Sequence, residues 1–170
     1  MNGLVLRNSL TNPITQYKLE GDELMNKDDV IGNTYLFRGI TADDFSALAR
    51  IVEQVVFLPG HLVYDVDQVS DAIIVIQMGT VDIVVKGKQA PIVTMGNGQT
   101  LGELAFFQPG KRFATATARE RTEVARIPFD KLRELFAERP TLALLFYRNA
   151  CTFLAKHVRE LASERDRRYF

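Results

Sequence analysis

Glu103 and Arg112 lie nine positions apart and carry the side chains best suited to hold a small polar ligand. Arg112 offers a planar fork of N–H donors, which fits the oxygens of a phosphate. An ionised Glu103 only accepts hydrogen bonds, so its partner must be a donor such as a ribose hydroxyl. The pair therefore predicts a pocket that takes a phosphate at one end and a sugar hydroxyl at the other.

The residues next to this pair favour the same chemistry. Gly102 allows the backbone to approach a ligand closely. If residues 103–106 begin a helical turn, their free backbone N–H groups form an anion site. A simpler alternative is a surface salt bridge between Glu103 and Arg112, since such pairs are common and weak.

Short β-branched runs separated by glycine turns surround these residues. We predict strands over 55–58, 62–64, 73–76, 81–85, 91–94, 113–118 and 124–127. Many short strands at this spacing are typical of a closed barrel or jelly roll. They do not alternate with long helices, and the chain has no Gly-x-x-x-x-Gly-Lys-Ser/Thr phosphate loop, so a Rossmann or P-loop nucleotide site is not expected.

Helices are predicted on both sides of the strands. Thr41 is a good N-cap for a first helix, and residues 130–138 form a short one before Pro140. Thr141 can cap a longer helix that runs to about Arg165. The expected fold is α+β, mainly β: a jelly-roll β-barrel with a flanking N-terminal helix and a long C-terminal helix. We divide the chain into an arm (1–34), this domain (35–165) and a tail (166–170).

The long helix carries two apolar faces. One face, which could cover the barrel mouth, holds Leu142, Leu145, Phe146, Asn149 and Phe153. The other is a heptad seam of Leu144, Tyr147, Cys151, Leu154, Val158 and Leu161. A second copy of the chain would cover this seam, so we predict a homodimer through the C-terminal helix. The alternative is that the arm covers it.

Composition limits the class of protein. The 170 residues are 46% hydrophobic and 25% charged, which is an ordinary globular balance. Lys plus Arg and Asp plus Glu each number 21, so no basic field indicates direct nucleic acid binding. No signal peptide begins the sequence, and its most apolar stretch, 142–154, is too short to span a membrane. We expect a soluble cytoplasmic protein without membrane attachment.

Residues 102–115 resemble the phosphate-binding cassette of the cyclic-nucleotide-binding domain family, which includes catabolite activator proteins and protein kinase A regulatory subunits. Segments 57–64, 71–85 and 92–100 resemble its first turn, central hairpin and pre-cassette loop, and the resemblance covers roughly 35–161. It implies a cyclic nucleotide, cAMP or cGMP, as ligand. It also implies a regulatory domain for signal transduction, with no metal.

The resemblance assigns roles residue by residue. Glu103 would bind the ribose 2′-hydroxyl and Arg112 the cyclic phosphate. The base would lie near the C-terminal helix. The ligand-binding set that it implies is Gly102, Glu103, Leu104, Ala105, Arg112, Phe113, Ala114 and His157.

Two features depart from the family. Phe113 stands where a small residue is usual, so its ring would either stack on the base or block the ordinary cAMP pose, and blocking is our expectation. Val66-Asp67 replaces the usual Gly-Asp before the hairpin.

The chain ends at Phe170, where catabolite-activator-like proteins continue into a helix-turn-helix domain, so we expect an unknown protein partner rather than DNA.

Other functions remain open at this stage. A blocked pocket would leave a dimerisation or protein-interaction module with no nucleotide ligand. A haem or metal sensor would have to use His61 or His157, the only histidines, and Cys151 is the only cysteine. An enzyme is not expected, because no carboxylate pair, Ser-His-Asp set or His-Glu-x-x-His motif is evident.

Overall fold

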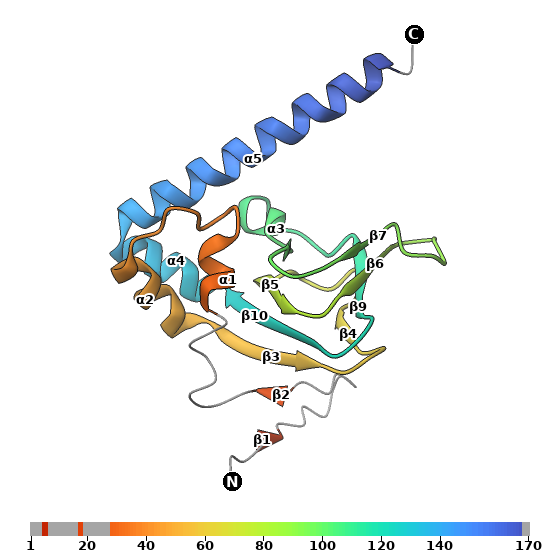
Figure 1. The fold of residues 1–170 in the computed structure, drawn as a ribbon, viewed down its shortest axis with the longest axis horizontal. Helices are drawn as coiled ribbons and strands as arrows, with labels where there is room; N and C mark the ends of the chain where they lie inside the picture. The colour runs from red at the N-terminus through yellow and green to blue at the C-terminus, as the bar shows by residue number, and fades with distance from the viewer. Residues whose placement is uncertain (1–4, 7–16, 19–27, 168–170) are drawn as a thin grey trace.

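The computed structural model describes residues 5–6, 17–18 and 28–167. Most of the predicted arm and the last three residues of the predicted tail therefore lie outside the described residues. Two antiparallel sheets face each other and a layer of helices covers one of them (Figure 1). The predicted jelly-roll barrel with flanking helices is confirmed.

The larger sheet has the strand order β1-β2-β3-β10-β5-β8 and the smaller one β4-β9-β6-β7. The strands of the larger sheet are β1 (Val5–Leu6), β2 (Tyr17–Lys18), β3 (Glu53–Phe57), β10 (Thr122–Pro128), β5 (Ala72–Met78) and β8 (Thr100–Leu101). Those of the smaller sheet are β4 (Leu62–Tyr64), β9 (Ala114–Ala118), β6 (Val81–Val85) and β7 (Val93–Met95). Each strand predicted from the sequence is present; β4 and β6 have the predicted ends, and the ends of the others differ by at most two residues.

Strand β5 separates two hydrophobic cores, because successive side chains of a strand point to opposite faces. Ile74 and Ile76 join the core between the two sheets. Ile73 and Val75 join the core between the larger sheet and the helices. All residues from Ala72 to Gln77 are consequently buried.

The helical layer begins earlier in the chain than the sequence predicts. Helix α1 (Asp28–Asn33) lies within the predicted arm, yet its Ile31 is fully buried in the core. Helix α2 (Ala42–Ile51) follows, and the Thr41 hydroxyl accepts a hydrogen bond from the Asp44 N–H at 3.1 Å. This confirms the N-cap that was predicted at Thr41.

The last two helices meet at Pro140. Helix α4 (Phe129–Glu138) has Arg139 as its C-cap, and α5 (Pro140–Arg167) starts at the proline itself. The expected N-cap at Thr141 is therefore wrong: proline fits the first helical position, because that residue needs no hydrogen-bonded N–H. Helix α5 then runs past α3 (Leu104–Phe107) and extends beyond the rest of the domain (Figure 1).

One face of α5 packs on the domain and the other does not. Leu142 and Phe146 are buried against the helical layer rather than at the barrel mouth, which corrects the position expected for this face. The seam of Leu144, Tyr147, Cys151, Leu154, Val158 and Leu161 is exposed, with Leu144 71% and Val158 65% accessible. Tyr147 is the seam residue that also packs on the domain, where its ring contacts those of Phe106, Phe107, Phe136 and Phe146.

Candidate functional site

A cavity of about 290 Å³ opens between the smaller sheet and the loop that carries α3. Its volume is close to the lower end of the range of small-molecule sites. Its lining includes Gly102, Glu103, Leu104, Ala105, Arg112, Phe113 and Ala114. The fold thus brings together all the predicted ligand-binding residues except His157.

The backbone around Arg112 is fixed by the loop that precedes β5. Its N–H donates to the Gln68 carbonyl at 2.8 Å, and its own carbonyl accepts from the Asp67 N–H at 2.9 Å. Val69 and Lys111 form an isolated antiparallel bridge at the same place. These contacts hold the arginine at the start of β9 with its side chain directed inward.

The Arg112 guanidinium is buried, with 7% of the residue exposed, yet it is poorly paired. Nη2 donates to the Ala72 carbonyl at 3.3 Å, while Nε and Nη1 have no hydrogen-bond partner among the described residues. The group lies 4.1 Å from the centroid of the Tyr64 ring, a cation–π contact. Burial lowers the pKa of Arg112, which Tyr64, Asp71 and Glu103 partly offset.

Two free donors on a buried cation are costly unless a ligand takes them up. A buried guanidinium with free N–H donors suits the oxygens of a phosphate. The hydrogen bonds of Arg112 also exclude the simple salt bridge with Glu103, because none of its nitrogens bonds that carboxylate.

Gly102 makes the position of the guanidinium possible. Its φ of +80° lies in the left-handed region, where a side chain is strained. A Cβ there would lie 1.9 Å from Nη1 of Arg112 and 3.0 Å from the Ala72 carbonyl oxygen. Glycine is therefore needed both for the turn and for the arginine.

Glu103 is half-buried at the other side of the cavity and faces Thr100 and Tyr35. Burial raises its pKa above the ordinary value, while its own backbone N–H and the nearby hydroxyls of Tyr35 and Thr100 favour the ionised form. The charge of Arg112 acts in the same direction without a direct contact. The carboxylate is thus an oriented acceptor next to a cavity.

The backbone amides contribute less than the sequence indicated. Within α3, the Ala105 N–H donates to the Gly102 carbonyl at 3.3 Å and the Phe106 N–H to the Glu103 carbonyl at 3.0 Å. The expectation that all N–H groups of residues 103–106 are free is therefore wrong, because this short turn closes on itself. Among the predicted anion-binding groups, Arg112 offers two donors that have no partner within the described residues.

Exposed apolar side chains border the cavity. We call this the apolar rim: Ile92, Val93, Leu104 and Phe113, which are 56%, 45%, 51% and 68% exposed. Phe113 does not fill the cavity, and most of its ring faces solvent. This position suits a contact with a flat ligand surface lying in the opening.

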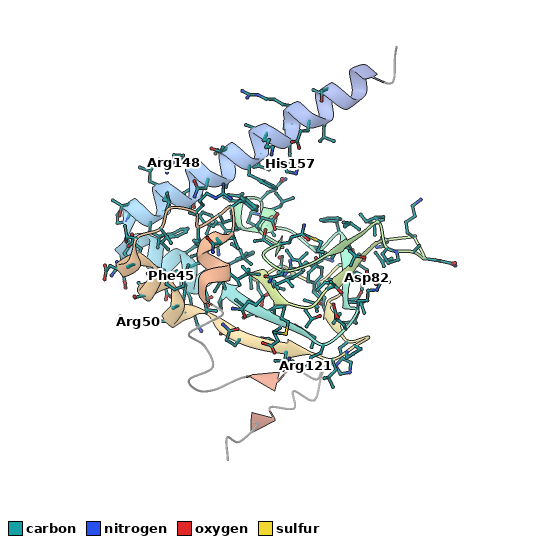
Figure 2. The ribbon with its side chains drawn as sticks, viewed as in Figure 1. Phe45, Arg50, Asp82, Arg121, Arg148 and His157 are labelled. Carbon is teal, nitrogen blue, oxygen red and sulfur yellow. The ribbon has the colours of Figure 1, made fainter. Side chains whose placement is uncertain are left out.

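His157 lies elsewhere, on α5 where that helix projects from the domain (Figure 2). Its side chain is exposed, its Nδ1 is 3.2 Å from the Phe153 carbonyl, and it does not line the cavity. The predicted contact between His157 and a base would require α5 to approach the cavity.

Three residues of the site were not found from the sequence. The Tyr64 ring lies under the Arg112 guanidinium, and Tyr35 and Thr100 lie near Glu103. Tyr64 closes a predicted strand, but alternation places it opposite the buried Val63, and the strand is irregular at this point. No spacing rule connects Tyr35 with Glu103.

Two other kinds of feature are absent from the part of the chain that the structure describes. No group of three or more His, Cys, Asp or Glu side chains is arranged to hold a metal ion there. None of the helices described is both long enough and apolar enough to cross a membrane.

Comparison with known proteins agrees with this geometry. The family model of the cyclic nucleotide-binding domain matches residues 54–139. A CRP-like cAMP-activated global transcriptional regulator of Mycobacterium tuberculosis is 29% identical over 122 residues, covering 68% of this chain and 53% of that protein. A cAMP-dependent protein kinase regulatory subunit of Debaryomyces hansenii is 30% identical over 119 residues, covering 69% of this chain and 26% of that protein.

Solved structures share the fold. A cyclic nucleotide-binding domain from Methylobacillus flagellatus superposes with a TM-score of 0.72 at 20% identity, covering 85% of this chain and 84% of that one. The N-terminal domain of a transcriptional regulator from Streptomyces coelicolor superposes with a TM-score of 0.70 at 23% identity, covering 76% of this chain and 94% of that one. Because the family model matches half of the chain and includes Arg112 and Glu103, this protein belongs to the cyclic nucleotide-binding domain family.

Proposed function

We propose that this protein is a regulatory domain that binds a cyclic nucleotide in the cavity between Arg112 and Glu103. The single observation that carries the proposal is the buried Arg112 guanidinium, whose Nε and Nη1 have no partner among the described residues. A cyclic phosphate would accept hydrogen bonds from the guanidinium, and the ribose 2′-hydroxyl would donate to Glu103.

We assign cAMP as the first ligand to test. Both aligned relatives carry cAMP in their names, one as a cAMP-activated regulator and the other as a subunit of a cAMP-dependent kinase. The apolar rim supports a nucleobase in the opening, where Phe113 offers an aromatic face. The role is regulatory rather than enzymatic and needs no metal.

The output would pass through α5. Its seam exposes apolar side chains along one face, so a second copy of the chain would bury them and give a homodimer. A ligand that favours one position of α5 would increase the population of that position. An unknown protein partner would then respond to the new position of the helix. The proposal includes a cytoplasmic location and no direct contact with nucleic acid.

A second candidate function rests on the same helix. The exposed seam and the departure at Phe113 would also fit an interaction module of this fold that takes no nucleotide. In that case the free donors of Arg112 would be a remnant of the site. The two functions differ in a single measurable property, nucleotide affinity.

Isothermal titration of the purified protein with cAMP, cGMP and a cyclic dinucleotide tests the proposal. We expect saturable binding of cAMP with one site per chain. Absence of heat with all three nucleotides, in protein shown by its melting curve to be folded, would contradict it and favour the interaction module.

A further inference from the structure

The Arg112 guanidinium lies against the ring of Tyr64, the last residue of strand β4. Its Cζ is over the ring, 4.1 Å from the centroid, in a cation–π contact. Gly102 also comes close to the same group, since a Cβ there would lie 2.9 Å from Cζ and 1.9 Å from Nη1. This buried cation is thus in contact with an aromatic ring and with bare backbone.

Hydrogen bonds alone do not fix the guanidinium. The one from Nη2 to the Ala72 carbonyl is long, at 3.3 Å, and Nε and Nη1 have no partner within the described residues. A single long hydrogen bond leaves a planar group free to turn about it. The face of the Tyr64 ring attracts a cation, so it supplies a contact that restrains this rotation.

A second cavity, also of about 290 Å³, offers the guanidinium another place. Arg112 and Tyr64 line both cavities, and the second one is also lined by the acidic residues Glu53 and Asp71. The charge of Asp71 already acts on Arg112, whose pKa it raises against the effect of burial. The second cavity therefore competes with the ligand cavity for the side chain.

The two acids can accept a further donor. Arg126 pairs with Glu53 at 2.7 Å and with Asp71 at 2.5 Å. An ionised carboxylate has about four acceptor positions, so these pairs leave positions open on both acids. Without a restraint, the Arg112 guanidinium would turn toward them.

We infer that Tyr64 is a positioning residue for the phosphate: its ring holds the Arg112 guanidinium at the ligand cavity and away from the acids of the second cavity. The inference rests on the proposed function and extends it. Because the ring holds the guanidinium before a ligand arrives, binding does not have to order this side chain. The ring thus increases affinity without touching the phosphate.

Calorimetric titration of the whole protein with cAMP is the first test. Tyr64→Leu keeps an apolar side chain but removes the ring. It should weaken binding by roughly five- to thirtyfold, the range of a desolvated cation–π contact. Tyr64→Phe keeps the ring and should bind within about twofold of the parent.

Val81→Ala is the control for a general loosening of the fold. Val81 is fully buried in the core between the two sheets and lines neither cavity. Its truncation should lower the free energy of unfolding, because it leaves a void in this core. It should keep the cAMP affinity of the parent.

Nuclear magnetic resonance of the arginine side chains gives a second test, which needs no nucleotide. A proton over an aromatic ring is shifted upfield by the ring current, and Arg112→Lys identifies the Nε–H signal of Arg112 by its loss. We expect this signal to lie upfield of those of exposed arginines in the parent, in Tyr64→Phe and in Val81→Ala. In Tyr64→Leu it should move toward them.

Three results would overturn the positioning role. They are parent-like cAMP binding by folded Tyr64→Leu, an Arg112 signal that does not move in that variant, and an equal loss of affinity in Tyr64→Phe, which would assign the effect to the hydroxyl. A folded parent that binds no cAMP overturns the proposed function, and the Arg112 signal then still decides whether the ring holds the guanidinium.

Discussion

Gly102 and Arg112 are packed so closely that a Cβ at position 102 would lie 1.9 Å from Nη1 of the arginine. Gly102→Ala must therefore displace the guanidinium, and it also strains a backbone with φ of +80°. We expect nucleotide affinity to fall more than tenfold and stability to fall by about 1–3 kcal/mol. Calorimetry and chemical denaturation measure the two effects.

Gly60→Ala is the control for this substitution. Gly60 has a φ of +81°, and nothing lies within 4 Å of the place that a Cβ would take there. It should lose comparable stability and keep the affinity of the parent. Parent-like nucleotide binding by Gly102→Ala would show that the guanidinium need not stay where the structure has it.

Phe113 offers a test of the apolar rim. The ring is 68% exposed, so Phe113→Ser should change the free energy of unfolding by less than about 0.5 kcal/mol. If the ring stacks on the base, the same change should weaken cAMP binding by about 1 kcal/mol. Stronger binding by Phe113→Ser would instead support the blocking role that the sequence alone indicated.

Glu103 makes stability depend on pH. Burial raises its pKa above the ordinary value of 4.5, so the folded protein binds this proton more tightly than the unfolded chain does. Its contribution to folding is therefore complete below pH 4.5 and is lost as pH rises through the raised pKa. Glu103→Gln cannot ionise and escapes this loss.

Thermal melts of the ligand-free proteins from about pH 4 to pH 8 check this prediction. The melting temperature of Glu103→Gln relative to the parent should rise with pH. The same variant should bind cAMP more weakly by about 1–2 kcal/mol at neutral pH. A difference in melting temperature that does not change with pH would argue against a raised pKa.

The seam of α5 gives a prediction about assembly. Leu154→Asp with Leu161→Asp places two charges where a dimer would bury apolar side chains, so sedimentation should show a monomer at tens of micromolar. Thr152→Asp with Ser163→Asp adds the same charge at exposed positions off the seam and should leave the dimer intact. A parent that sediments as a monomer, with and without nucleotide, would remove the dimer from the proposal.

The strands and helices could be predicted because their signals are local. The β-branched run of β5 and the N-cap at Thr41 are read from neighbouring residues, and both elements are present. Strand β8 (Thr100–Leu101) was missed, because two residues are too few to show an alternation. Helix α1 was missed because its six residues carry little periodicity, and only packing shows that Ile31 is buried.

In the candidate site, too, the features set by neighbouring residues could be predicted from the sequence, and those set by distant segments could not. Residues 102–114 are close in sequence, so their gathering around one cavity could be predicted. The contact of Tyr35 with Glu103 could not, because it depends on how the segment before α2 lies against α5. The loss of free amides in α3 also depends on a turn closing on itself, which residue types do not show.

Arg112 carries the central claim, and one calorimetric experiment tests it most directly. Arg112→Ala removes the only buried cation that lines the cavity among the described residues, so cAMP binding should weaken by about 2–4 kcal/mol. Arg119→Ala, which removes an exposed arginine, should bind like the parent. If folded Arg112→Ala binds cAMP as tightly as the parent does, the phosphate site assigned to this cavity is wrong.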